Sequence, residues 1–62
     1  MGKKDFIYRL RIARKEAKET HHWLELIKEA NPEFADKMEN LFQEIREIRN
    51  ILSAMISKSE NK

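Results

Sequence analysis

The 62-residue sequence contains no cysteine, one glycine and one proline. Without cysteine the chain forms no disulfide and no thiolate metal site, and a cysteine-free chain suits a reducing, cytoplasmic environment. One glycine and one proline are too few to punctuate several strands, so we expect a helical protein with a single break. No run of about 18 apolar residues is present, and the sequence therefore predicts no membrane span.

Charged residues are abundant, and the two signs are unevenly distributed. Residues 1–18 carry seven basic and two acidic side chains, a balance of +5, whereas residues 19–62 carry six basic and nine acidic side chains, a balance of −3. Such an asymmetry fits an acidic partner such as RNA. It fits equally well an oligomer in which oppositely charged parts of two chains meet.

The single strong break lies in the sequence EANPEF. Asn31 is a good helix N-cap, and Pro32 then falls at the first helical position, where its fixed φ suits a helix start. Asp5 is placed to cap an earlier helix in the same way. We therefore predict one domain, residues 1–62, with helices at about 5–30 and 32–58 and a frayed tail at 59–62.

Apolar residues on both sides of the break recur in alternating steps of four and three, which is the spacing of a heptad seam. The first series is Phe6, Leu10, Ala13, Ala17, Thr20, Leu24 and Ile27. The second series is Phe34, Met38, Leu41, Ile45, Ile48, Leu52 and Met55. Folding the chain at Asn31-Pro32 pairs residues whose numbers sum to 61 or 62, so that small side chains face large ones. The predicted fold class is all-α, an antiparallel two-helix hairpin.

A hairpin of this size leaves much of its seam in water, and further apolar residues lie outside the seam. The candidate interface residues are Tyr8, Ile12, Trp23, Leu26, Phe42, Arg49 and Ile56. Arg49 is included because it lies between Phe42 and Ile56 in the heptad. The sequence therefore predicts a homo-oligomer, with a dimeric four-helix bundle favoured. An adaptor fragment completed by another chain is the alternative.

Residues 3–27, KKDFIYRLRIARKEAKETHHWLELI, resemble the third helix of the 23S rRNA intervening-sequence (S23-type) four-helix-bundle protein family. The matching positions are Lys3, Lys4, Asp5, Phe6, Ile7, Leu10, Ile12, Ala13, Glu16, Glu19, Thr20, Trp23 and Leu24. The second arm is more loosely similar to the last helix of those proteins, through LSAMI. The resemblance covers only the C-terminal half of the family's domain. It implies a four-helix bundle, a pentamer as the alternative to a dimer, and no assigned chemistry.

The stretch KETHHWLELI places two histidines next to each other, which raises the question of a metal or catalytic site. Glu19 and His22 have the Glu-x-x-His spacing of di-iron bundles, but both lie off the seam, where such ligands would not point inward. His21 and Glu25 form an i,i+4 pair of a kind that is common on solvated helices. We therefore expect no catalytic residue, no metal and no cofactor, and a protein that is not an enzyme.

A basic stripe on the first helix is the candidate nucleic-acid site. Its residues are Lys4, Arg11, Arg14, Lys15, Lys18 and His22. All except the bordering Arg14 fall within about 60° of one another around a helix. Such a stripe can contact phosphates, or it can be a solvated face with i,i+4 partners. RNA or DNA binding through this stripe is therefore the alternative function.

Overall fold

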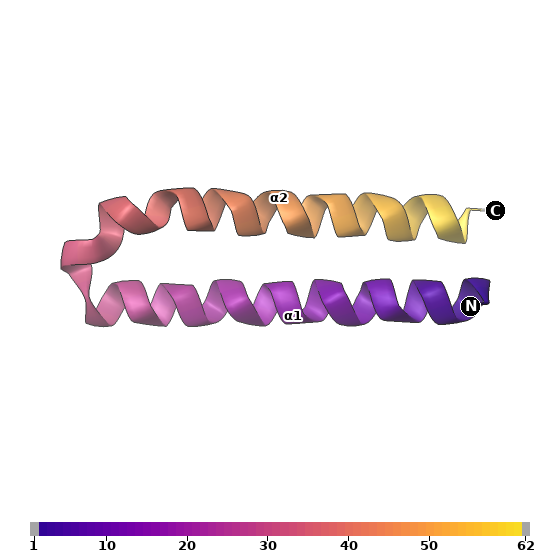
Figure 1. Ribbon diagram of the computed structural model, residues 1–62, viewed down its shortest axis with the longest axis horizontal. Coiled ribbons are helices and arrows are strands. Elements are labelled where there is room, and N and C mark those ends of the chain that lie inside the picture. Colours follow the sequence, from indigo (N-terminus) through magenta and orange to yellow (C-terminus); the bar gives the residue numbers. More distant parts are fainter. Residues whose placement is uncertain (1, 62) are drawn as a thin grey trace.

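The computed structural model describes residues 2–61 and shows two antiparallel helices joined by a tight turn (Figure 1). Helix α1 spans Lys3–Ala30, a short 3-10 turn η1 spans Pro32–Phe34, and helix α2 spans Ala35–Glu60. The helices lie side by side along a rod with extents of 46 × 14 × 14 Å. The predicted all-α hairpin is confirmed, and both helices extend beyond their predicted outer ends.

The turn is built from Asn31 and Pro32, although Asn31 acts on the helix that precedes it. The Asn31 backbone N–H donates to the carbonyl oxygens of Ile27 and Lys28, at 2.9 and 3.2 Å. Its side-chain Nδ2 also donates to the Ile27 carbonyl oxygen, at 3.0 Å. Asn31 therefore closes the C-terminus of α1 instead of capping the second helix. Pro32 does occupy the first position of η1, where its missing N–H leaves no bond unmade.

Helix α1 begins at Lys3, two residues before the predicted start, and Asp5 lies in its first turn without acting as a cap. The Oδ2 atom of Asp5 accepts a hydrogen bond from Arg9 Nε at 3.3 Å. A negative charge in this turn is favoured by the positive end of the helix dipole.

Helix α2 continues through Glu60, two residues beyond its predicted end. The Glu60 carboxylate forms an ion pair with Arg11 of α1, which ties the end of α2 to the first helix. Residues 59 and 60 of the predicted frayed tail are therefore helical. Lys62 lies outside the described residues.

The side chains enclosed between the helices follow an unbroken seven-residue repeat. Its central line is Leu10, Ala17, Leu24, Asn31, Met38, Ile45, Leu52 and Ser59, all buried or half-buried. A second line, Ile7, Arg14, His21, Lys28, Ala35, Phe42, Arg49 and Ile56, is buried or half-buried except at Lys28. Because the repeat passes through Asn31 without a shift, both helices face each other with equivalent heptad positions.

The predicted seam is correct along its central line and wrong along its other line. Leu10, Ala17, Leu24, Met38, Ile45 and Leu52 do lie between the helices. Phe6, Ala13, Thr20, Ile27, Phe34, Leu41, Ile48 and Met55 are instead exposed. A central line can be completed by the line on either side of it, and the hairpin uses the side that carries Phe42 and Ile56.

The core of a single hairpin is small. Leu10, Ala17, Met38, Phe42 and Ile56 are its buried members among the described residues. The total accessible surface is 5108 Å². Size scaling gives about 4,200 Å² for a compact protein of this 7.5 kDa mass. The hairpin therefore exposes about 900 Å² more than a compact monomer of its mass would.

Candidate functional site

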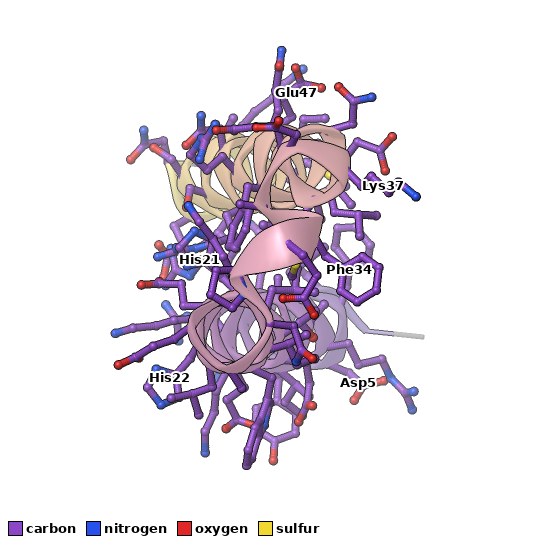
Figure 2. The ribbon with its side chains drawn as sticks, turned by 90° about the vertical axis from the view of Figure 1, so that its left-hand side faces the viewer. Asp5, His21, His22, Phe34, Lys37 and Glu47 are labelled. Atoms are coloured by element: carbon purple, nitrogen blue, oxygen red, sulfur yellow. The ribbon has the colours of Figure 1, made fainter. Side chains whose placement is uncertain are left out.

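The two sides of the hairpin differ in chemistry. We call one the apolar flank, formed by Phe6, Ala13, Thr20, Ile27, Phe34, Leu41, Ile48 and Met55. We call the other the polar flank, formed by Lys4, Arg11, Lys18, Glu25, Pro32, Glu39, Arg46, Ser53 and Glu60. At about 100° per residue, the two sets lie roughly 80° to either side of the seam. Figure 2, a view along the rod, shows Phe34 on one side and His21 and His22 on the other.

The apolar flank carries large side chains that the single hairpin leaves open to solvent. Phe6, Ile27, Phe34, Leu41, Ile48 and Met55 each expose 40–48% of their surface. Lys37 partly shields one end of the flank, because its Nζ lies 5.9 Å from the centroid of the Phe34 ring. Scattered apolar side chains on a surface are ordinary, whereas a continuous exposed row such as this is more typical of an interaction surface.

The candidate interface residues are found in three different places. Tyr8, Ile12, Trp23 and Leu26 are exposed on α1 outside the apolar flank. Phe42 and Ile56 are only 6% and 3% exposed, because they pack inside the hairpin itself. Arg49 is half-buried and belongs to the second line of the seam. Phe42, Ile56 and Arg49 are therefore unavailable to an apolar interface. The row that is available is the apolar flank, whose residues the sequence predicts as seam.

A groove of about 610 Å³ runs between α1 and α2 on the polar side of the hairpin. We call it the basic groove, and it is lined by Arg11, Arg14, Lys15, Lys18, Arg46, Arg49, Asn50 and Ser53. Six of these eight residues are Lys or Arg and none is acidic. Arg11 is ion-paired with Glu60, which is not part of the lining, and the groove as a whole is a positive surface. Four of its residues come from each helix, which makes it a feature of the hairpin and not of one helix face.

The predicted basic stripe is brought together only in part. Arg11, Arg14, Lys15 and Lys18 line the basic groove, whereas Lys4 and His22 do not. Sequence reasoning missed Arg46, Asn50 and Ser53 because their place beside α1 depends on the register between the helices. That register was available as a signal, since Arg46 and Ser53 continue the seven-residue repeat of Arg11 and Lys18 through the turn.

Arg14 and Arg49 are the two cations of the basic groove that are half-buried, and both occupy seam positions. Their numbers sum to 63, as do those of His21 and Phe42, whose ring centroids lie 5.4 Å apart across the seam. Arg14 Nη1 donates a hydrogen bond to Ser53 Oγ at 3.3 Å. Among residues 2–61, neither guanidinium has a carboxylate within ion-pair distance. Two like charges thus share this part of the seam, with no acidic partner in the described part of the chain.

A second hollow adjoins the basic groove on the outer side of α1. It is lined by Lys15, Lys18, Glu19, His22 and Trp23, so the two lysines border both depressions. The Trp23 side chain is 62% exposed, and its ring centroid lies 6.3 Å from that of His22. An aromatic face therefore stands in solvent directly beside the cationic surface.

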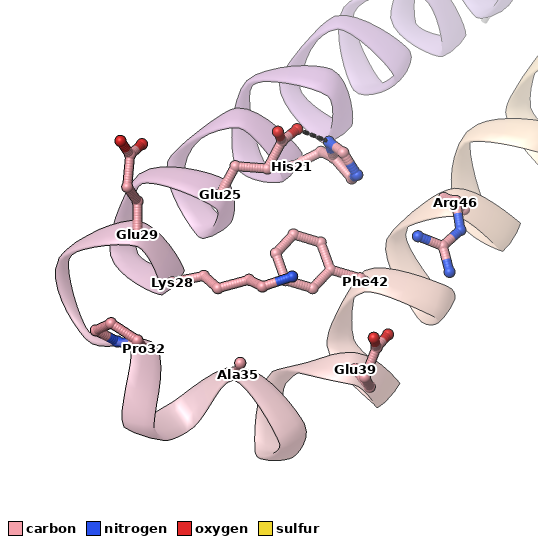
Figure 3. Close-up of a pocket in the computed structure, with 9 residues that line it drawn as sticks. All are labelled: His21, Glu25, Lys28, Glu29, Pro32, Ala35, Glu39, Phe42 and Arg46. Carbon is pink, nitrogen blue, oxygen red and sulfur yellow. Dashed lines mark ion pairs between the residues drawn. The ribbon is translucent and has the colours of Figure 1, made fainter.

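Toward the turn, the polar side holds a hollow of about 510 Å³ with mixed charge (Figure 3). His21 Nδ1 lies 2.8 Å from Glu25 Oε1, and Lys28 Nζ lies 5.4 Å from the centroid of the Phe42 ring. Glu29 and Glu39 add two further carboxylates. Over residues 2–61, no three His, Asp or Glu side chains gather into a group that would hold a metal ion. The acidic residues of this hollow contrast with the lining of the basic groove, which has none.

Comparisons with protein-family models, with curated proteins and with solved structures found no match. The resemblance to S23-type proteins therefore rests on the residues of the sequence alone. Within the described part of the chain, neither helix combines the length and the apolar character needed to cross a membrane.

Proposed function

We propose that this chain is a self-association module, in which two hairpins pack through their apolar flanks to form a homodimeric four-helix bundle. The observation that carries the proposal is the row of eight exposed, uncharged positions that repeats every seven residues along both helices. Such a repeat is how one coiled helix pair presents a continuous surface to another.

The excess surface of the hairpin agrees in size with an interface. Each chain exposes about 900 Å² more than a compact protein of its mass, which is about 1,800 Å² for two chains. Specific and stable interfaces bury about 1,200–2,000 Å² in total. An interface of ordinary size between two hairpins would therefore bury about as much area as the two hairpins expose in excess.

The apolar flank is also complementary to itself, which favours a second copy of this chain as the occupant. In the middle of the flank, α1 carries the small residues Ala13 and Thr20, whereas α2 carries the large residues Leu41 and Ile48. A two-fold axis parallel to the helices places α2 of each chain against α1 of the other, so that the large side chains face the small ones. Large side chains set against small ones interlock closely, as in other packed helical layers.

The resemblance to S23-type proteins supports the same architecture, since it implies a four-helix bundle of which this chain supplies two helices. A pentamer, which the family also suggests, and an adaptor completed by a different chain are the competing assemblies. The dimer is preferred because its single two-fold interface uses the self-complementary row of the apolar flank.

The test compares two neighbouring substitutions on α2. Leu41→Glu places a charge in the apolar flank, whereas Asn40→Glu places the same charge one residue away on the outer surface; both residues are exposed in the single hairpin. We expect Leu41→Glu to weaken dimerisation about 100-fold, since two leucine contacts worth about 1.5 kcal/mol each are lost. Asn40→Glu should leave dimerisation nearly unchanged.

Analytical ultracentrifugation at micromolar concentration measures both variants and the unmodified chain. We expect the unmodified chain to sediment at twice its 7.5 kDa mass, with a thermal midpoint that rises with concentration. A folded 7.5 kDa monomer across the concentration range would contradict the proposal, and a mass of five chains would replace the dimer with a ring.

A further inference from the structure

We propose that the basic groove binds the phosphate backbone of a single-stranded nucleic acid and that Trp23 stacks on one of its bases. This inference goes beyond self-association, because the cations of the groove belong to one hairpin and lie on its polar side. Trp23 lies on the outer surface of α1, where its helical neighbours include Thr20 and Ile27 of the apolar flank. The site combines cations from both helices, so it is not the basic stripe of one helix that the sequence predicts.

The first argument is the position of Arg14 and Arg49 in the seam. A seam gains stability from apolar side chains, and a charged residue at such a position is retained at a cost to stability. Here both helices contribute an arginine to the same part of the seam, and neither guanidinium has an acidic partner among residues 2–61. An anionic ligand that entered the groove would supply the missing negative charge, and guanidinium groups suit phosphate oxygens because they donate two parallel hydrogen bonds.

The second argument is the length of the groove. Arg11 to Lys18 on α1 spans about 10 Å of helix, and Arg46 to Ser53 on α2 spans the same length. A strand of duplex form carries one phosphate per about 3.4 Å, so about three phosphates fit along the cations. A free phosphate ion would use only a small part of this surface, whereas a polyanionic chain would use all of it.

The third argument is the aromatic face next to the groove. Lys15 and Lys18 line both the groove and the hollow that contains Trp23, so a strand that follows these lysines passes the indole ring. Exposed aromatic rings bind unpaired bases by stacking, with about 1–3 kcal/mol per base. Bases in a duplex are already stacked on one another, and the combination therefore favours a single strand.

The binding test uses a labelled single-stranded uridine oligonucleotide of about 12 nucleotides, within the range of known single-strand site sizes. The test variant is Lys15→Gln/Lys18→Gln/Arg46→Gln, which removes three exposed cations of the groove. The matched control is Lys3→Gln/Arg9→Gln/Lys58→Gln, which gives the same net charge but changes residues that do not line the groove. Circular dichroism and sedimentation compare the fold and the assembly of all three proteins.

We expect the unmodified chain and the control variant to bind the oligonucleotide with similar affinity. The groove variant should bind at least about tenfold more weakly, and the slope of log K against log salt should fall by about 2, because about three phosphate contacts are lost. Trp23 is the single tryptophan of the chain, so its fluorescence reports the stacking contact directly. It should be quenched by the oligonucleotide and unaffected by inorganic phosphate.

Several results would overturn the proposal. Equal weakening in the groove variant and the control would show that only net charge matters. Displacement of the oligonucleotide by inorganic phosphate at the same phosphate concentration would assign the groove to a free anion. Dissociation of the dimer by the groove substitutions would make the groove a contact between protein chains. Unchanged Trp23 fluorescence on saturation, or equally tight binding of a duplex, would remove the stacking contact.

Discussion

The apolar flank and the polar flank are built from positions of the same heptad, yet they present opposite chemistry to solvent. The apolar flank has no charged residue at its eight positions, whereas the polar flank leads into a groove whose lining includes six Lys or Arg residues. Because the seven-residue repeat passes through the turn without a shift, each flank is formed by equivalent heptad positions of both helices. A hairpin of this kind therefore holds two separate surfaces back to back, and we assign each of them a different partner.

The two lines of residues on either side of the central line also differ in composition, and the hairpin leaves the more apolar of the two exposed to solvent. The line that completes the seam includes Arg14 and Arg49, and the line left exposed includes Phe34 and Leu41. Long amphipathic side chains can cover a seam with their stems while their charged ends stay in water. The more apolar line is thereby free to meet another hairpin.

The largest expected effect on stability distinguishes Phe42, on the second line of the seam, from Phe34, on the apolar flank. Phe42 is buried in the seam, and Phe42→Ala should lower the free energy of unfolding by about 3–5 kcal/mol, as for other buried aromatic residues. Phe34 lies on the apolar flank and is half open to solvent in the single hairpin. Phe34→Ala should mainly weaken dimerisation. The thermal midpoint of this variant should therefore depend on protein concentration more strongly than the midpoint of the unmodified chain does.

Thermal unfolding followed by circular dichroism over a hundredfold range of concentration measures both variants. If Phe34→Ala and Phe42→Ala have the same effect at every concentration, the distinction between seam and apolar flank is wrong.

A smaller effect of opposite sign tests the two seam arginines. Arg14→Leu/Arg49→Leu should raise the free energy of unfolding by about 0.5–2 kcal/mol, because it extends the apolar seam and removes two unpaired charges. Lys18→Leu/Arg46→Leu serves as the comparison, since it removes two exposed cations of the same groove without filling the seam. Denaturant unfolding should show a gain in stability for the first pair only, while both pairs weaken oligonucleotide binding. A loss of stability in Arg14→Leu/Arg49→Leu would mean that the arginines hold the helices together.

The sequence predicts much of the fold, because its strongest signals are local. Pro32 fixes the break, and the steps of four and three locate Leu10, Ala17, Leu24 and their counterparts on the central line. The lines on either side of the central line are equally compatible with that spacing. The choice between them decides whether Phe6 or Ile7 faces the partner helix, and amphipathicity cannot separate contacts within a chain from contacts between chains.

The α1 residues of the candidate site can be predicted from the sequence of that helix, whereas the α2 residues can be placed only with the register between the two helices. Arg11, Lys15 and Lys18 stand out because they lie on one face of a single helix. Arg46 and Ser53 join them only through the pairing of α1 with α2, and a one-residue error in that pairing turns them away. The prediction of Arg49 at an apolar interface has another cause: its heptad neighbours Phe42 and Ile56 are apolar, but all three lie on the second line of the seam.

The central claim, that the apolar flank is covered by a second copy while the basic groove stays open, is tested most directly by thiol accessibility. The chain has no cysteine, so Ile48→Cys and Arg46→Cys each introduce a single reporter, on the apolar flank and in the groove respectively. Raising the protein concentration through the dimer dissociation constant should slow alkylation of the Ile48→Cys thiol about tenfold, because reaction follows the open population. The rate for Arg46→Cys should stay constant over the same range. Rates independent of concentration at both positions, or protection at position 46 alone, would contradict this account.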